Sequence, residues 1–154
     1  MQYVSTADED EICVFCRLLE SDNDEEAGIL YRGKRVFVVL NAFPYNTGHL
    51  MVAPRRHIGE LHDLEPGERA DLMEVSSESV DHISAAMSPH GFNLGMNLGT
   101  VAGAGIPGHL HMHVVPRWGG DTNYMTVVGE TKVLPEMLHE TYRKLRPLFT
   151  SAEW

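Results

Sequence analysis

The stretch GHLHMHVVPR, residues 108–117, constrains this chain more than any other part of its sequence. Alternate side chains of a β-strand lie on one face, so a strand here places His109, His111 and His113 together and the apolar residues between them on the opposite face. The apolar face suits a hydrophobic core. The three imidazoles would stand about 6.5 to 7 Å apart from one to the next. Imidazole titrates near neutrality, so this row suits nucleophilic attack, proton transfer or metal ligation.

A catalytic metal is one alternative reading of the same row. Two histidines in a His-x-His pair can offer nitrogens to one zinc ion, but the third ring would lie about 13 Å from the first along the strand. A single metal therefore leaves one histidine unexplained. The other histidines, apart from His57, are interpreted as ordinary structural residues: His49, His62, His82, His90 and His139.

Length and composition indicate one ordinary globular domain. The chain has 154 residues, of which 43% are hydrophobic and 22% charged, enough to bury one core. The formal net charge is −10, and no broad basic face is visible, so no nucleic-acid partner is expected. Basic residues gather in residues 53–57 and at Arg117, a pattern that suits a small anionic ligand.

The sequence predicts neither a membrane segment nor a secretion signal. No apolar run approaches the roughly 18 to 20 residues that span a bilayer, and the N-terminus lacks the basic and apolar regions of a signal peptide. We therefore expect a cytoplasmic protein with no membrane partner. Its two cysteines, Cys13 and Cys16, form a C-x-x-C pair, which in a reducing compartment indicates half of a metal site or a redox pair.

Hydrophobic patterning predicts an α+β domain on an antiparallel meander sheet of about five strands, with a main helix and a C-terminal helix. We expect a single domain over residues 1–154, with an acidic, partly flexible segment at about 1–11. The predicted elements are two strands around a tight turn at 32–35, a strand at 48–54, a helix at 66–87, a strand at 92–99, the histidine strand, a short strand contact at 126–128 and a helix at about 135–148.

A glycine-rich loop, residues 99–108, leads directly into the histidine strand. Glycine lets backbone N–H groups approach and surround an anion, as in phosphate-binding loops. Such a loop is also typical of a flexible turn. Next to a candidate nucleophile, it becomes a candidate phosphate site.

These motifs resemble a known family. HLHMHVV is similar to the signature of the histidine triad (HIT) superfamily, and CVFC and LNAFPYNTGHLMVAPRRHI resemble two further segments of that family in the same order. PRWGGDTNYM is most similar to the branch that contains bacterial diadenosine tetraphosphate phosphorylases and hydrolases. The resemblance implies a HIT-like fold and an enzyme that acts on the α-phosphate of a nucleotide.

The resemblance also implies a role for each site residue. His111 is the nucleophile and becomes transiently nucleotidylated, His113 contacts the phosphate, and His109 supports the geometry. Substrate contacts are expected from Asn41 to ribose, Phe15 and Val39 to the base, Asn97 to the phosphates, and the backbone donors near Gly105 and Ile106 to the equatorial oxygens. Asn41 would also suit a turn at a strand end, and Phe15 and Val39 would suit any core. Gly105 departs from the family, whose members carry Gln or Ser there.

The same resemblance implies a structural zinc site. Its ligands would be Cys13, Cys16, His57 and His109, a set suited to tetrahedral coordination. The alternative is a pair of unligated reduced cysteines, with His57 as a surface or anion-contacting residue. No organic cofactor is expected, and Mg²⁺ can accompany a polyphosphate substrate.

We therefore expect an enzyme that splits diadenosine polyphosphates by phosphorolysis or hydrolysis, working as a homodimer or a tetramer of dimers. The alternatives are a purine nucleoside phosphoramidase, a non-catalytic nucleotide-binding module, and a zinc-dependent hydrolase that uses His109 and His111 as ligands. The catalytic reading requires the His111 ring to face an open cavity.

Overall fold

The computed structural model describes residues 13–121 and 136–150. The predicted strand contact at 126–128 and the N-terminal segment 1–11 lie outside these residues. The helices are α1 (Val14–Glu20), α2 (Asp24–Ala27), α3 (Pro66–Met87) and α5 (Leu138–Thr150), with short 3₁₀ helices η1 (Leu61–Asp63) and η2 (Thr100–Ala102). The strands are β1 (Ile29–Arg32), β2 (Val36–Leu40), β3 (Leu50–Pro54), β4 (Gly91–Gly95) and β5 (Met112–Arg117).

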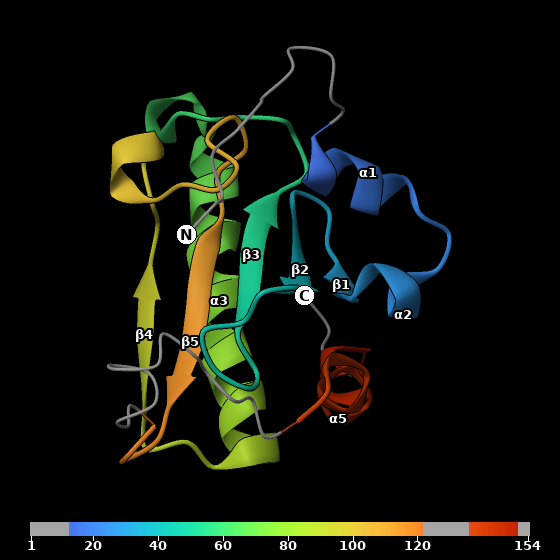
Figure 1. Cartoon of the computed structure of the whole chain (residues 1–154). Coiled ribbons are helices and arrows are strands. Elements are labelled where there is room, and N and C mark those ends of the chain that lie inside the picture. The colour runs from blue at the N-terminus through green and yellow to red at the C-terminus, as the bar shows by residue number, and fades with distance from the viewer. Residues whose placement is uncertain (1–12, 122–135, 151–154) are drawn as a thin grey trace.

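The five strands form one sheet in the order β1-β2-β3-β5-β4, and every neighbouring pair is antiparallel. The predicted α+β class is therefore confirmed, but the prediction of a simple meander is wrong. β5 lies between β3 and β4 in the sheet (Figure 1). In the chain, α3 connects β3 to β4, so these two strands need not be neighbours. A helix of 22 residues is about 33 Å long. The connection through α3 is therefore long enough to leave room for one strand, β5, between β3 and β4.

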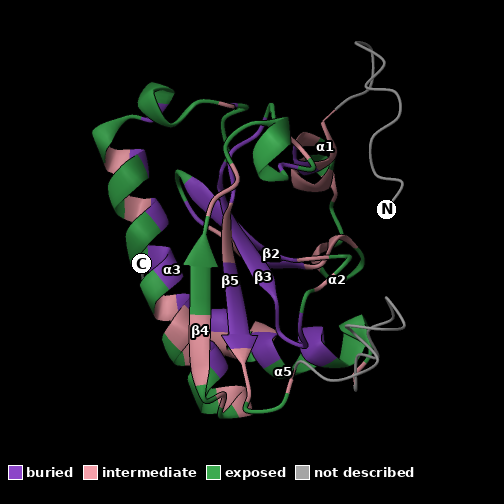
Figure 2. Cartoon of the chain, turned by 60° about the vertical axis from the view of Figure 1, so that its left-hand side comes forward, coloured by how far each residue is buried: buried purple, intermediate pink, exposed green. Residues whose placement is uncertain are grey.

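Both faces of the sheet carry buried hydrophobic residues, and different helices pack on the two faces. All of β2 is buried, yet its residues alternate between two hydrophobic clusters. Val36, Val38 and Leu40 pack in the cluster that contains residues of α3 and α5. Phe37 and Val39 pack on the opposite face, which we call the α1 face, in a cluster with Phe15, Ile29, Met51 and Ala53. Figure 1 looks onto this face, with α3 behind the sheet, and Figure 2 shows that much of the edge strand β4 is exposed.

The main helix begins and ends where the sequence predicts. Pro66 occupies the first turn, and Glu65 and Glu68 form a reciprocal capping box. Ser88, with a φ of 48°, ends the helix in the left-handed conformation just before Pro89. The C-terminal helix is confirmed as well, although it begins at Leu138 and not at residue 135.

Helices α1 and α2 were not predicted. They have seven and four residues, too few for a helical period to emerge from the sequence. Arg32 holds the segment between them, because its guanidinium donates to the carbonyl of Leu19 at 2.7 Å, to the carbonyl of Ser21 at 2.8 Å and to Asp24 at 2.7 Å. Tertiary hydrogen bonds thus place α1 over the sheet.

Within the described residues, no helix combines the length and the apolar character needed to cross a membrane.

Candidate active site and metal centre

The histidine stretch alternates between the two sheet faces as predicted, but its strand begins late. β5 starts at Met112, so His109 and His111 precede it. Leu110 and Val114 pack in the cluster under α3. His113 pairs with Met51 of β3 and Gly95 of β4, which places it on the α1 face.

His111 is oriented by its own backbone. Its Nδ1 lies 2.9 Å from the carbonyl oxygen of His109, and because a carbonyl only accepts, Nδ1 must carry the hydrogen. Burial lowers the pKa of His111, so the ring is neutral at pH 7 and its lone pair lies on Nε2. That nitrogen makes no hydrogen bond to the described residues. A neutral imidazole with a free Nε2 is suited to attack phosphorus.

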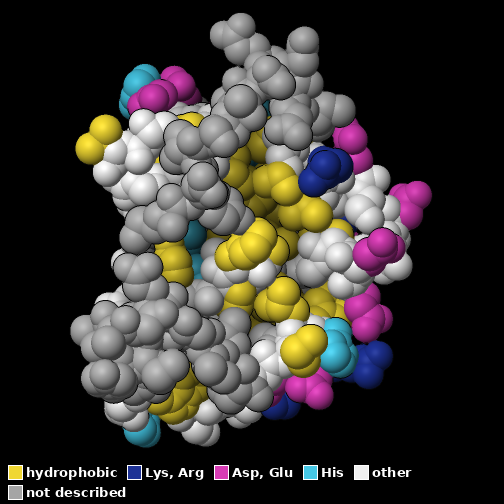
Figure 3. All heavy atoms as spheres, in the orientation of Figure 1, with side chains coloured by type: hydrophobic (Ala, Val, Ile, Leu, Met, Phe, Trp, Pro, Cys, Tyr) yellow, Lys and Arg dark blue, Asp and Glu magenta, His cyan; other side chains and the backbone are white. Residues whose placement is uncertain are grey.

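The surroundings of His111 are tighter than predicted. The residue is 6% exposed, with the ring of Phe15 at 5.1 Å and the ring of His113 at 4.8 Å. The adjoining cavity of about 440 Å³ is lined by His113 and not by His111. This cavity borders His113, and the prediction that an open cavity faces the His111 ring itself stays a prediction. Figure 3 shows histidine atoms recessed beside hydrophobic side chains on this face.

His113 is held by a second histidine, His49. The Tyr45 N–H donates to His49 Nδ1 at 3.0 Å, so in neutral His49 the hydrogen lies on Nε2. In this tautomer His49 Nε2 donates to His113 Nδ1 at 2.9 Å, and the longer 3.4 Å approach of Asn41 Nδ2 to His49 Nε2 is not a hydrogen bond. Burial and the neighbouring His111 lower the pKa of His113 to about 4. Neutral His113 therefore carries its hydrogen on Nε2, as a donor for a phosphate oxygen.

Sequence reasoning missed His49, which it interpreted as structural. The residue is 1% exposed and lies 64 positions from His113. Only the pairing of β3 with β5 brings the two together. A usable signal was present, because His49 directly precedes a strand that was predicted correctly.

The glycine-rich loop offers free backbone donors. Within the described chain, no hydrogen bond engages the N–H groups of Gly105, Ile106 or Gly108. A Cβ built on Gly105 would have no atom within 4 Å, so the loop is open at this position. Asn97 Nδ2 donates to the carbonyl of Gly103 at 3.2 Å and so braces the loop.

The residues predicted to bind the nucleoside gather in the cluster on the α1 face. Phe15 and Val39 are each 1% exposed, and Ile106 packs against the same cluster. Asn41 follows β2, and its Oδ1 accepts from the Phe43 N–H at 2.9 Å. Base and ribose binding by these residues stays a prediction.

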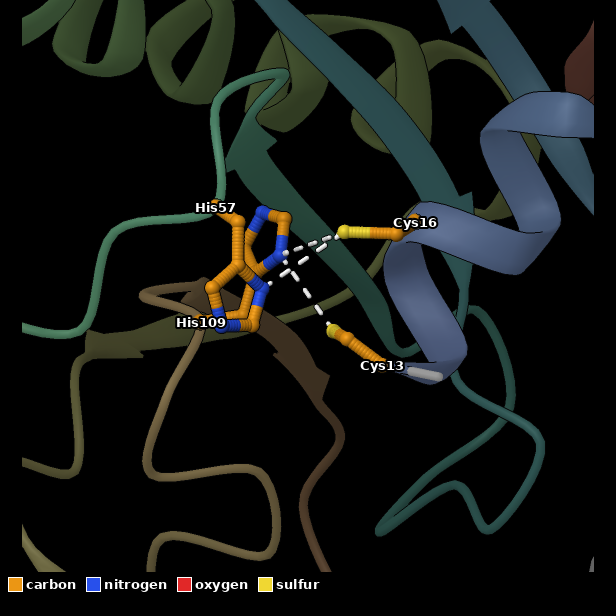
Figure 4. A group of neighbouring side chains, drawn as sticks. All are labelled: Cys13, Cys16, His57 and His109. Carbon is orange, nitrogen blue, oxygen red and sulfur yellow. Dashed lines mark hydrogen bonds between the residues drawn. The ribbon is translucent and has the colours of Figure 1, made fainter. Parts of the chain in front are cut away.

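Four predicted metal ligands do come together. The ligand atoms of Cys13, Cys16, His57 and His109 all lie within 4.8 Å of one another. The sulfur atoms of Cys13, at the N-cap of α1, and of Cys16, within α1, point toward the two imidazoles (Figure 4). Cys13 Sγ lies 3.4 Å from His109 Nδ1, and Cys16 Sγ lies 3.5 Å from His57 Nδ1.

The chemistry of this group fits zinc. His109 Nε2 lies 2.8 Å from the Pro54 carbonyl, so it carries the hydrogen and Nδ1 presents a lone pair to the sulfur atoms. Sulfur and nitrogen ligands of a tetrahedral zinc ion lie about 3.5 Å apart. The cluster found among the described residues contains His109 but not His111, which argues against a zinc hydrolase that uses both as ligands.

The clustered basic residues are engaged by acceptors of the protein itself, and their binding of a small anion stays a prediction. Arg56 binds the carboxylate of Glu68 at 2.6 and 2.7 Å. Arg55 donates to the carbonyl of Gly33 at 3.1 Å. Arg117 binds Asp121 at 2.6 and 2.9 Å and holds the pKa of that carboxyl far below its usual value. Each of these three arginines thus donates to a carboxylate or a backbone carbonyl of the protein itself.

Fold and site together define a histidine-triad domain. The model of the family described as HIT domain matches residues 22–120, and the chain belongs to this family. It is 49% identical over 132 residues to a Mycobacterium tuberculosis protein named AP-4-A phosphorylase, covering 86% of this chain and 65% of that protein. The chain thus spans about two thirds of the length of this relative.

Two further comparisons agree with the family. The chain is 33% identical over 93 residues to the asymmetrical bis(5'-nucleosyl)-tetraphosphatase of Schizosaccharomyces pombe, covering 60% of this chain and 50% of that protein. A zinc-bound histidine triad family protein of Mycobacterium smegmatis superposes with a TM-score of 0.73 at 26% identity, covering 90% of this chain and 94% of that chain.

Proposed function

We propose that this chain is a nucleotidyl transferase that splits diadenosine polyphosphates, such as diadenosine tetraphosphate, at an AMP-linked phosphate. The observation that carries the proposal is the orientation of His111, whose Nδ1 is engaged by the His109 carbonyl and whose Nε2 is free. The names of the M. tuberculosis and S. pombe relatives support the substrate class.

The reaction proceeds in two displacements. His111 Nε2 attacks the α-phosphorus, the N–P bond forms, and the P–O bond to the departing polyphosphate breaks, releasing ATP from diadenosine tetraphosphate. The nucleotidylated ring is then a cation, and the His109 carbonyl stabilises it through Nδ1–H. An oxygen of phosphate or water next attacks phosphorus, the N–P bond breaks, and ADP or AMP leaves.

Neutral donors stabilise the phosphate in both steps. The Nε2–H of His113 and the free N–H groups of Gly105 and Ile106 are suited to bind the oxygens on which charge develops. His49 acts as a positioning residue, since its bond to His113 Nδ1 keeps the hydrogen of His113 on Nε2. His113 keeps its proton throughout, because a polyphosphate leaves readily as an anion.

We also propose that Cys13, Cys16, His57 and His109 hold a structural zinc ion, which when bound ties α1 to the loop before β5. Mg²⁺ would arrive with the polyphosphate and not through a site of the protein.

We propose that residues 1–154 form one HIT domain that works as a homodimer or a tetramer of dimers in the cytoplasm. The exposed edge strand β4 supports pairing between copies. Two free thiols at metal-binding distance suit a reducing compartment.

Incubation with diadenosine tetraphosphate, with and without inorganic phosphate, tests the proposal. Phosphorolysis yields ADP and ATP and requires phosphate, whereas asymmetric hydrolysis yields AMP and ATP without it. Turnover of adenosine 5'-phosphoramidate alone would identify a phosphoramidase, the activity named for another S. pombe relative that is 26% identical over 105 residues. Nucleotide binding without turnover or a nucleotidyl-enzyme would identify a regulatory module.

A further inference from the structure

We propose that the cavity beside His113 is a second nucleoside subsite, which receives the adenosine on the far side of the bond that breaks. This inference rests on the proposed function. The residues that line the cavity include Tyr45, Asn93, Leu94, Gly95, His113 and Arg117. Its volume of about 440 Å³ falls within the range of small-molecule pockets.

Strand register places this cavity on the α1 face, at the opposite half of the sheet from α1. On β5, His113 pairs with Met51 on one side and with Gly95 on the other. Met51 belongs to the cluster that Phe15 of α1 covers. On the β4 side, no helix of the described residues packs on this face, and Gly95 carries no side chain. His113 thus separates a closed apolar half from an open half.

The direction of the reaction assigns the open half to the leaving group. An in-line displacement places the nucleophile and the leaving oxygen on opposite sides of phosphorus. The His111 ring lies 5.1 Å from the ring of Phe15, in the closed half, and 4.8 Å from the ring of His113. The predicted contacts of the transferred base, Phe15 and Val39, belong to the closed half next to α1. The polyphosphate and the second adenosine would then extend past His113 into the cavity.

The lining favours a nucleoside over a free phosphate. The charge of Arg117 is compensated, because Asp121 binds it through two bonds and Asn93 Oδ1 accepts a third at 2.7 Å. Apart from His113 and Asn97, which are assigned to the phosphates of the substrate, the rest of the lining is amide, aromatic and apolar. Such groups suit a flat, uncharged base and its sugar better than a multiply charged anion.

The walls of this cavity are held in place before any ligand arrives. Asn46, which is 6% exposed, donates from Nδ2 to the Pro116 carbonyl at 3.0 Å and to Asp121 at 2.7 Å. The neighbouring Tyr45 ring stacks on His49 at 4.8 Å and is still 55% exposed. The Nδ2 group of Asn93 makes no hydrogen bond to the described residues and is a donor available to a base.

Two glycines of β4 make a matched pair of variants. Gly95 lines the cavity, whereas Gly91 does not. They are four residues apart on one strand, so their side-chain positions share a face, and a Cβ on either would meet nothing within 4 Å. Gly95→Leu should therefore fill the cavity without disturbing the fold, and Gly91→Leu is its control.

Binding is measured by calorimetry with three probes: AMP, a methylene-bridged adenosine tetraphosphate, and a methylene-bridged diadenosine tetraphosphate. We expect Gly95→Leu to weaken the dinucleotide by about tenfold or more, with the other two probes bound within about twofold of the wild type. Gly91→Leu should bind all three as the wild type does. Asn93→Ala removes the amide without filling the cavity. It also removes one acceptor of Arg117, which stays bound to Asp121, so we expect it to weaken only the dinucleotide, by a smaller factor.

Equal weakening of adenosine tetraphosphate and the dinucleotide by Gly95→Leu would show that the cavity holds only the phosphate chain and would overturn the inference. Unchanged dinucleotide binding would overturn it too. These results are independent of turnover, so a failed activity assay with intact selective binding would reject the proposed reaction and not the subsite.

Discussion

The metal centre and the nucleophile use neighbouring histidines in opposite ways. His109 directs Nε2 to the Pro54 carbonyl at 2.8 Å, which leaves Nδ1 for the thiols. His111 directs Nδ1 to the His109 carbonyl at 2.9 Å, which leaves Nε2 for the substrate. The two rings are alike in chemistry and burial. The position of one backbone carbonyl decides which nitrogen is free, and hence whether the ring suits a metal or a phosphate.

The two regions are also in contact. Phe15 lies between the two cysteines in the sequence, and its ring packs on His109 at 5.2 Å and on His111 at 5.1 Å. Substitutions in one region, measured by their effects on both catalysis and stability, should therefore reveal how far the metal centre and the nucleophile are independent.

Removal of the nucleophile should have the largest effect. We expect His111→Ala to lower kcat on diadenosine tetraphosphate by about 10³-fold or more, because no other group can form the covalent intermediate. Acid-labile labelling with radioactive AMP should vanish in the same variant. His62→Ala, at an exposed histidine of η1, should behave as the wild type. If the label persisted in His111→Ala, the nucleotide would be attached to another residue, and the assignment of His111 as the nucleophile would be wrong.

Loss of a metal ligand should act on stability before chemistry. We expect the wild type to hold about one zinc ion per chain and Cys16→Ser to lose it, since a ligand set of three binds much less tightly. A chelator should lower the midpoint of thermal unfolding of the wild type by several degrees and leave that of the variant unchanged. A wild type that contains no metal and ignores the chelator would show that the cluster is only a pair of reduced cysteines with two histidines.

Substitution of His49 should have an intermediate effect on kcat. His49→Leu removes the donor to His113 Nδ1, and we expect a loss of about 10²-fold with little change in stability of the metal site. His49→Gln can still donate to His113 and should recover most of the activity. If Gln and Leu variants are equally slow, His49 serves packing and does not orient His113.

The smallest effect is expected from a change of pH between 8 and 6. Because the pKa of His113 is lowered to about 4, the ring takes up a proton only as the pH falls through that value, and the neutral form persists above it. We expect kcat/KM to change by less than about twofold between pH 8 and pH 6 and to be lost toward pH 4. A decline centred near the ordinary histidine pKa would contradict the lowered pKa of His113 or that of His111, which burial also lowers.

The sequence predicted most of the fold because its local patterns are strong. The helix at 66–87 has a proline in its first turn and ends before Pro89, the strand at 48–54 is a short apolar run that ends at Pro54, and the stretch at 108–117 alternates histidine with apolar residues. α1 escaped prediction because one face of seven residues shows no period. The place of β5 between β3 and β4 also escaped, because strand order depends on contacts and not on local pattern.

By itself, the sequence determined that three histidines share one side of a segment whose other side is apolar. The two cysteines were grouped with His57 only through the resemblance to the HIT family. Only the tertiary structure decided that His49 supports His113, that Arg117 is bound by Asp121, and that the cavity borders His113 and not His111. The physical reason is one of range: strand alternation follows from backbone geometry over a few residues, whereas tautomers, charge compensation and cavities depend on groups that only the packed sheet brings together.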